Sequence, residues 1–165
     1  MSSEQVEKKD YTDFVEEHDK YLMLRLGKQV FGVLVDSVED VLFPYKITEI
    51  PLSPPEIMGM INLRGRVVTA IDLGSKLGFE PLDAKADHRS VVIEKKGHFY
   101  SLVVNKVSEV IDIPVSKISS TPDNLSEKWK KVSVGVYSLD SELMVILDAA
   151  KLIDSDDDIA EVGEV

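Results

Sequence analysis

Cysteine is absent from this chain of 165 residues, so disulfides and thiolate metal ligands are excluded. Apolar runs are only a few residues long, far short of the roughly 20 that a membrane-spanning helix needs. The first residues also lack the basic start and apolar stretch of a signal peptide. We therefore predict a cytoplasmic protein without direct membrane insertion.

The sequence also lacks the motifs of common catalytic sites. It has no Walker motif, no GxGxxG after a strand, no HExxH and no GxSxG. Three histidines are present (His18, His88 and His98), but their spacing is not that of a metal-ligand cluster. We expect no catalytic residues, no metal and no cofactor, and hence no enzyme.

A basic stripe is missing too, although the chain is strongly charged. The net charge is −11, of which residues 1–20 carry −4 and residues 154–165 carry −6, which leaves −1 for residues 21–153. Acidic, aromatic-poor ends of this kind usually stay solvated, so both are predicted to be disordered tails. Nucleic acid is not an expected partner, because no cationic surface is available to displace phosphate counterions.

What the sequence has instead is a succession of short, β-branched or alternating apolar stretches. Gly and Pro interrupt them, and four prolines between positions 44 and 55 forbid a long helix there. The expected strands are residues 21–26, 29–35, 61–64, 66–72, 88–95 and 99–104, and short helical turns are expected at 56–60 and 73–77. Segment 36–42 fits either a strand or one helical turn.

The apolar frame occurs twice. Residues 31–42 align with 100–111 at an offset of 69, and residues 59–72 align with 135–148 at an offset of 76. The added residues fall near 116–131, where we expect a longer loop. Such a duplication favours two small antiparallel barrels, the first about 21–85 and the second about 86–153, with an exchange of strands at the boundary left open.

Four side chains are candidate functional residues. Arg64 sits at a hairpin turn whose second copy has no arginine, so it is either a partner contact or an ordinary solvated or locally paired cation. Asp72 and Asp148 occupy equivalent places, either as helix caps or, less simply, as an active-site pair. Trp129, the only tryptophan, either anchors a partner or covers a barrel end.

Four segments resemble the CheW family of bacterial chemotaxis adaptors. They read VFGVLVDSVEDV, GMINLRGRVVTAIDL, SLVVNKVSEVIDI and LMVILDAAKLI, in the order and spacing of the family, and the similarity covers about 21–153. The resemblance implies two linked five-stranded barrels of SH3-like type with short helices. It also implies a non-catalytic scaffold that couples the cytoplasmic tips of chemoreceptors to the regulatory domain of the histidine kinase CheA.

The family's receptor-binding positions fall on Val38, Asp40, Gly59 and Arg64, in a groove that the family forms between its barrels. The kinase-binding residues are not assigned. Through these partners the protein is expected at the membrane-associated receptor array. The family often has Glu where Asp40 stands, a departure that concerns receptor specificity. Two alternatives remain: a scaffold of the same kind in a motility or pilus array, and a small-ligand sensor that uses the groove between the barrels.

Overall fold

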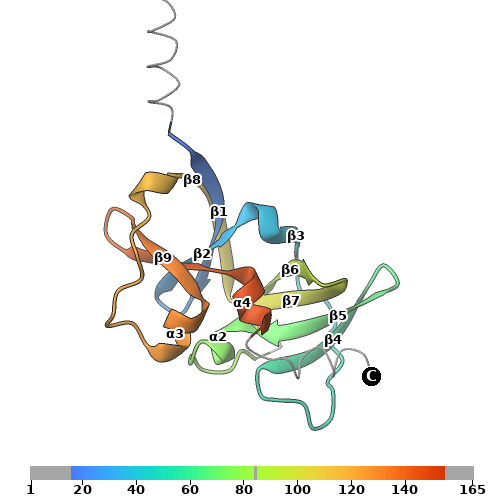
Figure 1. Cartoon of the computed structure of the whole chain (residues 1–165). Helices are drawn as coiled ribbons and strands as arrows, with labels where there is room; N and C mark the ends of the chain where they lie inside the picture. Colours follow the sequence, from blue (N-terminus) through green and yellow to red (C-terminus); the bar gives the residue numbers. More distant parts are fainter. Residues whose placement is uncertain (1–15, 84, 155–165) are drawn as a thin grey trace, which may run out of the picture.

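The computed structural model describes residues 16–83 and 85–154, which form a mainly β molecule with short helices (Figure 1). The strands are β1 (His18–Leu26), β2 (Gln29–Leu34), β3 (Val38–Leu42), β4 (Ile57–Leu63), β5 (Arg66–Asp72), β6 (Arg89–Lys95), β7 (His98–Val104), β8 (Lys106–Pro114), β9 (Ser133–Ser138) and β10 (Leu143–Leu147). The helices are η1 (Val35–Ser37), α2 (Leu73–Lys76), η2 (Val115–Lys117), α3 (Glu127–Val132) and α4 (Ala149–Asp154). Each of these helices is too short or too polar to cross a bilayer.

The strands form two five-stranded sheets that share strands from both halves of the chain. The first, called the β1 sheet, has the order β8-β1-β2-β10-β9, and the second, called the β6 sheet, has the order β3-β6-β7-β5-β4. The mainly β class with two five-stranded units and short helices is thus confirmed. One expectation was wrong, because β2 pairs with β10 and β5 pairs with β7 in parallel, so both sheets are mixed rather than antiparallel.

Strand register bears out the internal duplication residue by residue. In the β6 sheet Ile71 lies opposite Leu102. In the β1 sheet Leu147 lies opposite Val33. Leu147 is the repeat mate of Ile71 at the offset of 76, and Leu102 is the repeat mate of Val33 at the offset of 69. The pair Ile71–Leu102 in one sheet is therefore matched by the pair Leu147–Val33 in the other. The two sheets are therefore built on the same plan from complementary pieces of the chain.

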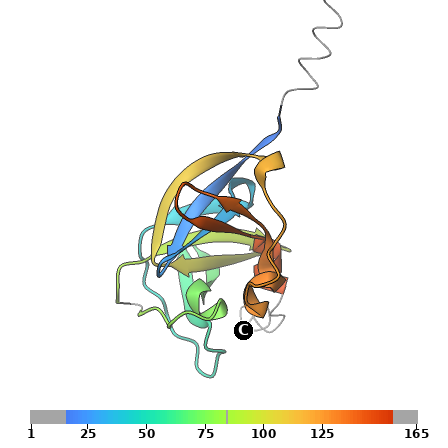
Figure 2. The ribbon, with the colours of Figure 1, turned by 90° about the vertical axis from the view of Figure 1, so that its left-hand side faces the viewer.

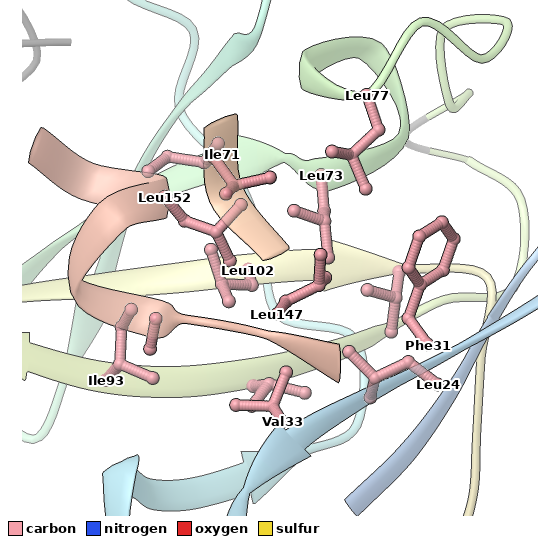
Figure 3. Close-up of a cluster of buried hydrophobic side chains, with 14 of the residues drawn as sticks. Leu24, Phe31, Val33, Ile71, Leu73, Leu77, Ile93, Leu102, Leu147 and Leu152 are labelled. Atoms are coloured by element: carbon pink, nitrogen blue, oxygen red, sulfur yellow. The ribbon is translucent and has the colours of Figure 1, made fainter. Parts of the chain in front are cut away.

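The main hydrophobic core lies between the two sheets. Large apolar side chains from both of them meet there, together with Leu152 of α4 (Figure 3). Fully buried members include Leu24, Phe31, Ile71 and Leu102. Burial of each such side chain stabilises the fold by roughly 1.5–3 kcal/mol. Two smaller clusters, one on the other face of each sheet, complete the interior.

The start of the chain and the proline-rich segment differ from expectation in detail. The acidic tails lie mostly outside the described residues, but β1 already begins at His18, three residues before the expected strand. The helical turn expected at 56–60 was wrong, since β4 begins at Ile57. Met60 is held there by two backbone hydrogen bonds of 2.8 Å with Thr48, an extended pairing that a helical turn would break.

Trp129 covers one end of the β1 sheet. Its indole Nε1 donates a hydrogen bond of 2.8 Å to the carbonyl oxygen of Leu77, and its ring centroid lies 5.1 Å from that of Phe31. The ring also stacks on Phe79 at 5.8 Å. Of the two interpretations left open by the sequence, the structure supports the covering role.

Candidate functional site

The β4–β5 turn is closed by its own sequence. Arg64 and Gly65 both adopt left-handed backbone, with φ of 54° and 79°. The side-chain oxygen of Asn62 accepts a hydrogen bond of 3.1 Å from the Gly65 amide, which fixes the turn. An L-residue in this region costs about 1–2 kcal/mol relative to right-handed backbone. Arginine at position 64 is therefore not explained by turn stability.

The Arg64 side chain is exposed. Within residues 16–83 and 85–154 its guanidinium has no hydrogen-bond or ion-pair partner. Local pairing with a carboxylate, one of the ordinary roles considered for this residue, is thus not what the structure shows. The group remains available to an external acceptor.

Arg64 borders a surface hollow of about 230 Å³, called here the Arg64 hollow. Its lining combines apolar side chains with two acidic and two basic ones: Leu63, Val68, Val92 and Phe99, then Glu39 and Asp40, then Arg64 and Arg66. All eight come from the β6 sheet and its β4–β5 turn. The guanidinium carbon of Arg66 lies 4.1 Å from the ring centroid of Phe99, and this cation–π contact holds the side chain in place.

A bulge in β3 separates two of the predicted site residues. Val38 lies opposite Ile93 and Asp40 lies opposite Val92, so Glu39 is the extra residue between them. Bulges of this kind redirect the side chains that flank them. Val38 packs against the core between the sheets, whereas Asp40 lines the Arg64 hollow and accepts a hydrogen bond of 2.9 Å from the amide of Val41.

Gly59 has a role inside the fold. It is buried with φ of 145°, and a Cβ on it would collide with the carbonyl oxygen of Thr48. Its repeat mate Gly135 meets the carbonyl of Ser119 in the same way. The close approach that glycine permits is therefore made by the chain's own backbone.

The structure thus brings together Asp40 and Arg64, and leaves Val38 and Gly59 outside the lining of the Arg64 hollow. Sequence reasoning missed Arg66 and Phe99. Arg66 is two residues beyond Arg64 and on the same strand alternation as Val68, a signal that was readable. Phe99 was not readable, because its place depends on the parallel pairing of β5 with β7.

The matching corner of the β1 sheet has the opposite chemistry. The repeat places Asp140 at the position of Arg64 and Glu142 at the position of Arg66. Arg25 donates two hydrogen bonds, of 2.8 and 3.1 Å, to the Glu142 carboxylate. These bonds lower the pKa of Glu142 and raise that of Arg25. At these two matched positions the β6 sheet has Arg64 and Arg66, whereas the β1 sheet has the acidic residues Asp140 and Glu142.

The carboxylates that the sequence singled out are structural. Asp72 accepts hydrogen bonds from the amides of Ser75 (3.2 Å) and Leu82 (2.7 Å), and its repeat mate Asp148 accepts them from the amides of Ala150 (2.9 Å) and Lys151 (3.3 Å). Both start a short helix. Helix capping by Asp72 and Asp148 is therefore confirmed.

Comparison with known proteins identifies a protein family that this chain matches. The family model described as CheW-like domain matches residues 20–157. A relative from Rhizobium etli described as a probable chemotaxis protein CheW is 30% identical over 131 residues, which cover 79% of this chain and 84% of the relative. Protein PilI of Pseudomonas aeruginosa is 26% identical over 121 residues, or 73% of this chain and 68% of that protein.

A solved structure has the same fold. The crystal structure of the scaffolding protein TtCheW from Thermoanaerobacter tengcongensis superposes with a TM-score of 0.72 at 28% identity. The match covers 79% of this chain and 89% of that one. The paired five-stranded sheets described above are thus shared with a scaffolding protein.

Proposed function

The chain belongs to the CheW-like domain family, and from this membership we propose that it is a non-catalytic adaptor that couples chemoreceptors to the histidine kinase CheA in chemotaxis arrays. In this role it binds the cytoplasmic tips of the receptors with one surface and the regulatory domain of the kinase with another. It needs no cofactor, and it lies in the cytoplasm at the membrane-associated array through its partners.

The observation that carries the receptor part of the proposal is the Arg64 hollow. Arg64 keeps a strained backbone and has no partner in the described part of the chain, and Asp40 lies in the same lining. A receptor tip is a helical hairpin, which offers apolar side chains for the floor and carboxylates or carbonyls for Arg64. The Asp40 carboxylate accepts a hydrogen bond from this helical hairpin or forms an ion pair with one of its cationic side chains.

Val38 and Gly59 support this surface from behind. Val38 sits next to the bulge that turns Asp40 outward, and Gly59 lets Thr48 pair with β4, the strand that leads into the Arg64 turn. We assign both residues to positioning rather than to direct contact. Substitutions there weaken receptor binding by displacing Asp40 or Arg64.

A single hollow of this size supports a modest affinity. A dissociation constant near 1 μM, or roughly −8 kcal/mol, is the expected order for the isolated receptor contact. Simultaneous binding of receptor and kinase raises the effective affinity through multivalency. Signal transfer then arises as coupling free energy, because each partner favours one arrangement of the complex.

Purified components test the proposal. The full chain is titrated by calorimetry with a receptor-tip fragment, with the CheA regulatory domain, and with each partner in the presence of the other. Binding to both, without mutual exclusion, is the expected result. Binding to neither, with the chain folded by circular dichroism, contradicts it.

The alternative role, in a motility or pilus array, differs from the chemotaxis role only in the partners. The same titrations with the receptor and kinase of a pilus system separate the two. Tighter binding to those proteins by more than tenfold, about 1.4 kcal/mol, assigns the chain to that pathway.

A further inference from the structure

Three buried polar atoms in β6, β7 and the segment before β6 have no hydrogen-bond partner among residues 16–83 and 85–154. They are Nε2 of His88 and the hydroxyl oxygens of Ser90 and Ser101. The three residues are at most 2% exposed. Buried polar atoms of side chains are mostly hydrogen-bonded, to protein groups or to ordered water, and each exception needs an explanation. These three atoms therefore need partners that the described residues do not supply.

Ser90 and Ser101 share one face of the β6 sheet. They lie on β6 and β7, neighbouring antiparallel strands that run side by side in both views of the ribbon (Figures 1 and 2). Ser90 lies opposite Val103, and Ser101 lies opposite Val92. Both valines belong to the small apolar cluster on the face of this sheet that is turned away from the main core. Because opposed residues of an antiparallel pair point to the same face, the two hydroxyls lie in that cluster.

The two hydroxyls are close enough to share a water molecule. They are diagonal neighbours, and in an antiparallel pair such residues have Cα atoms about 7–8 Å apart and side chains that come closer. A water that bonds to two oxygens at about 2.8 Å each spans up to about 5.6 Å. Buried waters typically make about three such bonds to polar groups that have no other partner. One bridging molecule therefore fits the separation of Ser90 and Ser101.

His88 adds an acceptor close to Ser90 in the chain. It stands two residues before Ser90, and its Nδ1 donates a hydrogen bond of 2.9 Å to the carbonyl oxygen of Ala86. A carbonyl oxygen only accepts, so Nδ1 carries the proton, and Nε2 of a neutral ring is left to accept a bond. Water can donate to this nitrogen, whereas apolar side chains cannot.

The matched positions of the β1 sheet carry different side chains. The offset of 69 places Tyr21 at the position of Ser90 and Gly32 at the position of Ser101. A Cβ on Gly32 would lie 2.9 Å from Sδ of Met144, so the methionine side chain fills the space over the glycine. Tyr21 and Met144 belong to the same buried cluster. In the β1 sheet this interior is therefore packed by a tyrosine and a methionine.

The β6 sheet has smaller side chains at these positions. At the offset of 76, Val68 stands where the β1 sheet has Met144. Ala70, which lies beside Ser101 in β5, stands where the β1 sheet has Ile146. Smaller apolar side chains together with two unpaired hydroxyls favour water in this interior.

The lining of the Arg64 hollow adjoins this interior. Val92, which lies opposite Ser101, and Phe99, which precedes Ser101 by two residues on β7, both line the hollow. Residues two apart on a strand point to the same face. Ser101 therefore lies directly behind the lining of the hollow.

We propose that the interior of the β6 sheet is a binding site for buried water, in which one molecule bridges the hydroxyls of Ser90 and Ser101 and another donates to Nε2 of His88. The water supplies the hydrogen bonds that the described residues do not. It also takes the place of the tyrosine and methionine side chains at the matched positions of the β1 sheet. The site is independent of the adaptor role, since it requires no partner protein.

Relaxation dispersion of ¹⁷O in water tests the site in solution with the full chain, because it detects waters that stay bound for longer than the protein takes to tumble. We expect Ser90→Ala with Ser101→Ala to reduce the dispersion amplitude by the contribution of at least one water molecule. Ser108→Ala with Ser120→Ala, which removes two exposed hydroxyls, should leave the amplitude unchanged. Circular dichroism checks that both variants fold. An amplitude that is the same in all three folded proteins, or that falls equally in both variants, overturns the proposal.

A high-resolution crystal structure of the unchanged protein tests the site without any substitution. The expected result is a water oxygen at about 2.7–3.2 Å from the hydroxyl oxygens of both Ser90 and Ser101, and another at that distance from Nε2 of His88. Hydroxyls that instead donate to backbone carbonyl oxygens, with no water between the two serines, overturn the proposal.

Discussion

Arg64 and Lys96 adopt the same backbone in two turns of one sheet, with φ of 54° and 52°, and a glycine follows each of them. The first turn joins β4 to β5, and the second joins β6 to β7. Only Arg64 borders the hollow that holds Asp40. The pair therefore offers a matched comparison, in which geometry and charge are alike and position differs.

Removal of either side chain should leave the fold intact. Glycine relieves the left-handed strain but adds conformational entropy to the unfolded chain, and the two effects nearly cancel. Arg64→Gly and Lys96→Gly are both expected to unfold within about 1 kcal/mol of the unchanged protein in urea. If Arg64→Gly alone lowers the free energy of unfolding by more than about 2 kcal/mol, the guanidinium stabilises the fold. That result would contradict the absence of a partner for Arg64 among the described residues.

Alanine substitutions at Gly59 and Gly65 distinguish destabilisation by backbone strain alone from destabilisation by strain together with a steric clash. Both have positive φ, but a Cβ at Gly65 meets nothing within 4 Å, whereas one at Gly59 meets the carbonyl of Thr48. Gly65→Ala is expected to cost about 1–2 kcal/mol, and Gly59→Ala about 3–4 kcal/mol because the hydrogen bonds between Thr48 and Met60 also break. Urea denaturation measures the difference, and equal costs contradict the structural role of Gly59.

The two helix-capping aspartates, Asp72 and Asp148, are expected to differ in how much stability the protein loses when each is replaced. Asp72 and Asp148 each accept bonds from two backbone amides, but Asp72 is 3% exposed and also accepts a bond from the Ser75 hydroxyl, whereas Asp148 is only half-buried. Asp72→Ala is expected to cost about 2–4 kcal/mol and Asp148→Ala about 1 kcal/mol. For a chain of this length, thermal midpoints fall by about 2–4 °C per kcal/mol. A larger loss at Asp148 would be inconsistent with the burial.

The ion pair between Arg25 and Glu142 predicts a dependence on pH. Hydrogen bonds from Arg25 lower the pKa of Glu142 in the folded state, so its contribution is present above the unfolded value of about 4.3 and is lost as pH falls through the lower folded pKa. The difference in thermal midpoint between the unchanged protein and Glu142→Gln should therefore shrink as pH falls from about 7 to about 3.

Glu94→Gln is the control for this titration, because the repeat aligns Glu94 with Arg25 and no ion pair of Glu94 occurs in the described part of the chain. Because Glu94 is exposed, the thermal midpoint of Glu94→Gln at about pH 7 should stay close to that of the unchanged protein. Both side chains of the Arg25–Glu142 pair are about a third exposed, so solvent screens the effect and salt should reduce it. A difference that grows toward low pH contradicts the pairing.

Much of the fold could be predicted because the duplication shows in the apolar positions. Offsets of 69 and 76 fixed which residues are equivalent, and the pairing of Ile71 with Leu102 and of Leu147 with Val33 follows them. Strand exchange between halves could not be decided, since apolar periodicity shows which face is buried and not which strand lies beside it.

The site was predictable only in part. Arg64 stood out because its repeat mate is an aspartate, and that asymmetry is local in sequence. The bulge at Glu39 and the approach of Phe99 depend on pairings between distant strands, so no pattern within one segment contains them. The close approach of Thr48 to Gly59 could not be predicted either, because a glycine in sequence does not reveal which backbone comes close to it.

The most direct test of the account is a calorimetric titration of a receptor-tip helical hairpin into the unchanged protein, Arg64→Glu and Lys96→Glu. We predict micromolar binding to the unchanged protein, a loss of at least about 30-fold (roughly 2 kcal/mol) for Arg64→Glu, and less than about threefold change for Lys96→Glu. Unchanged affinity of a folded Arg64→Glu protein, or equal losses in both variants, would contradict the claim that Arg64 is a specific receptor contact.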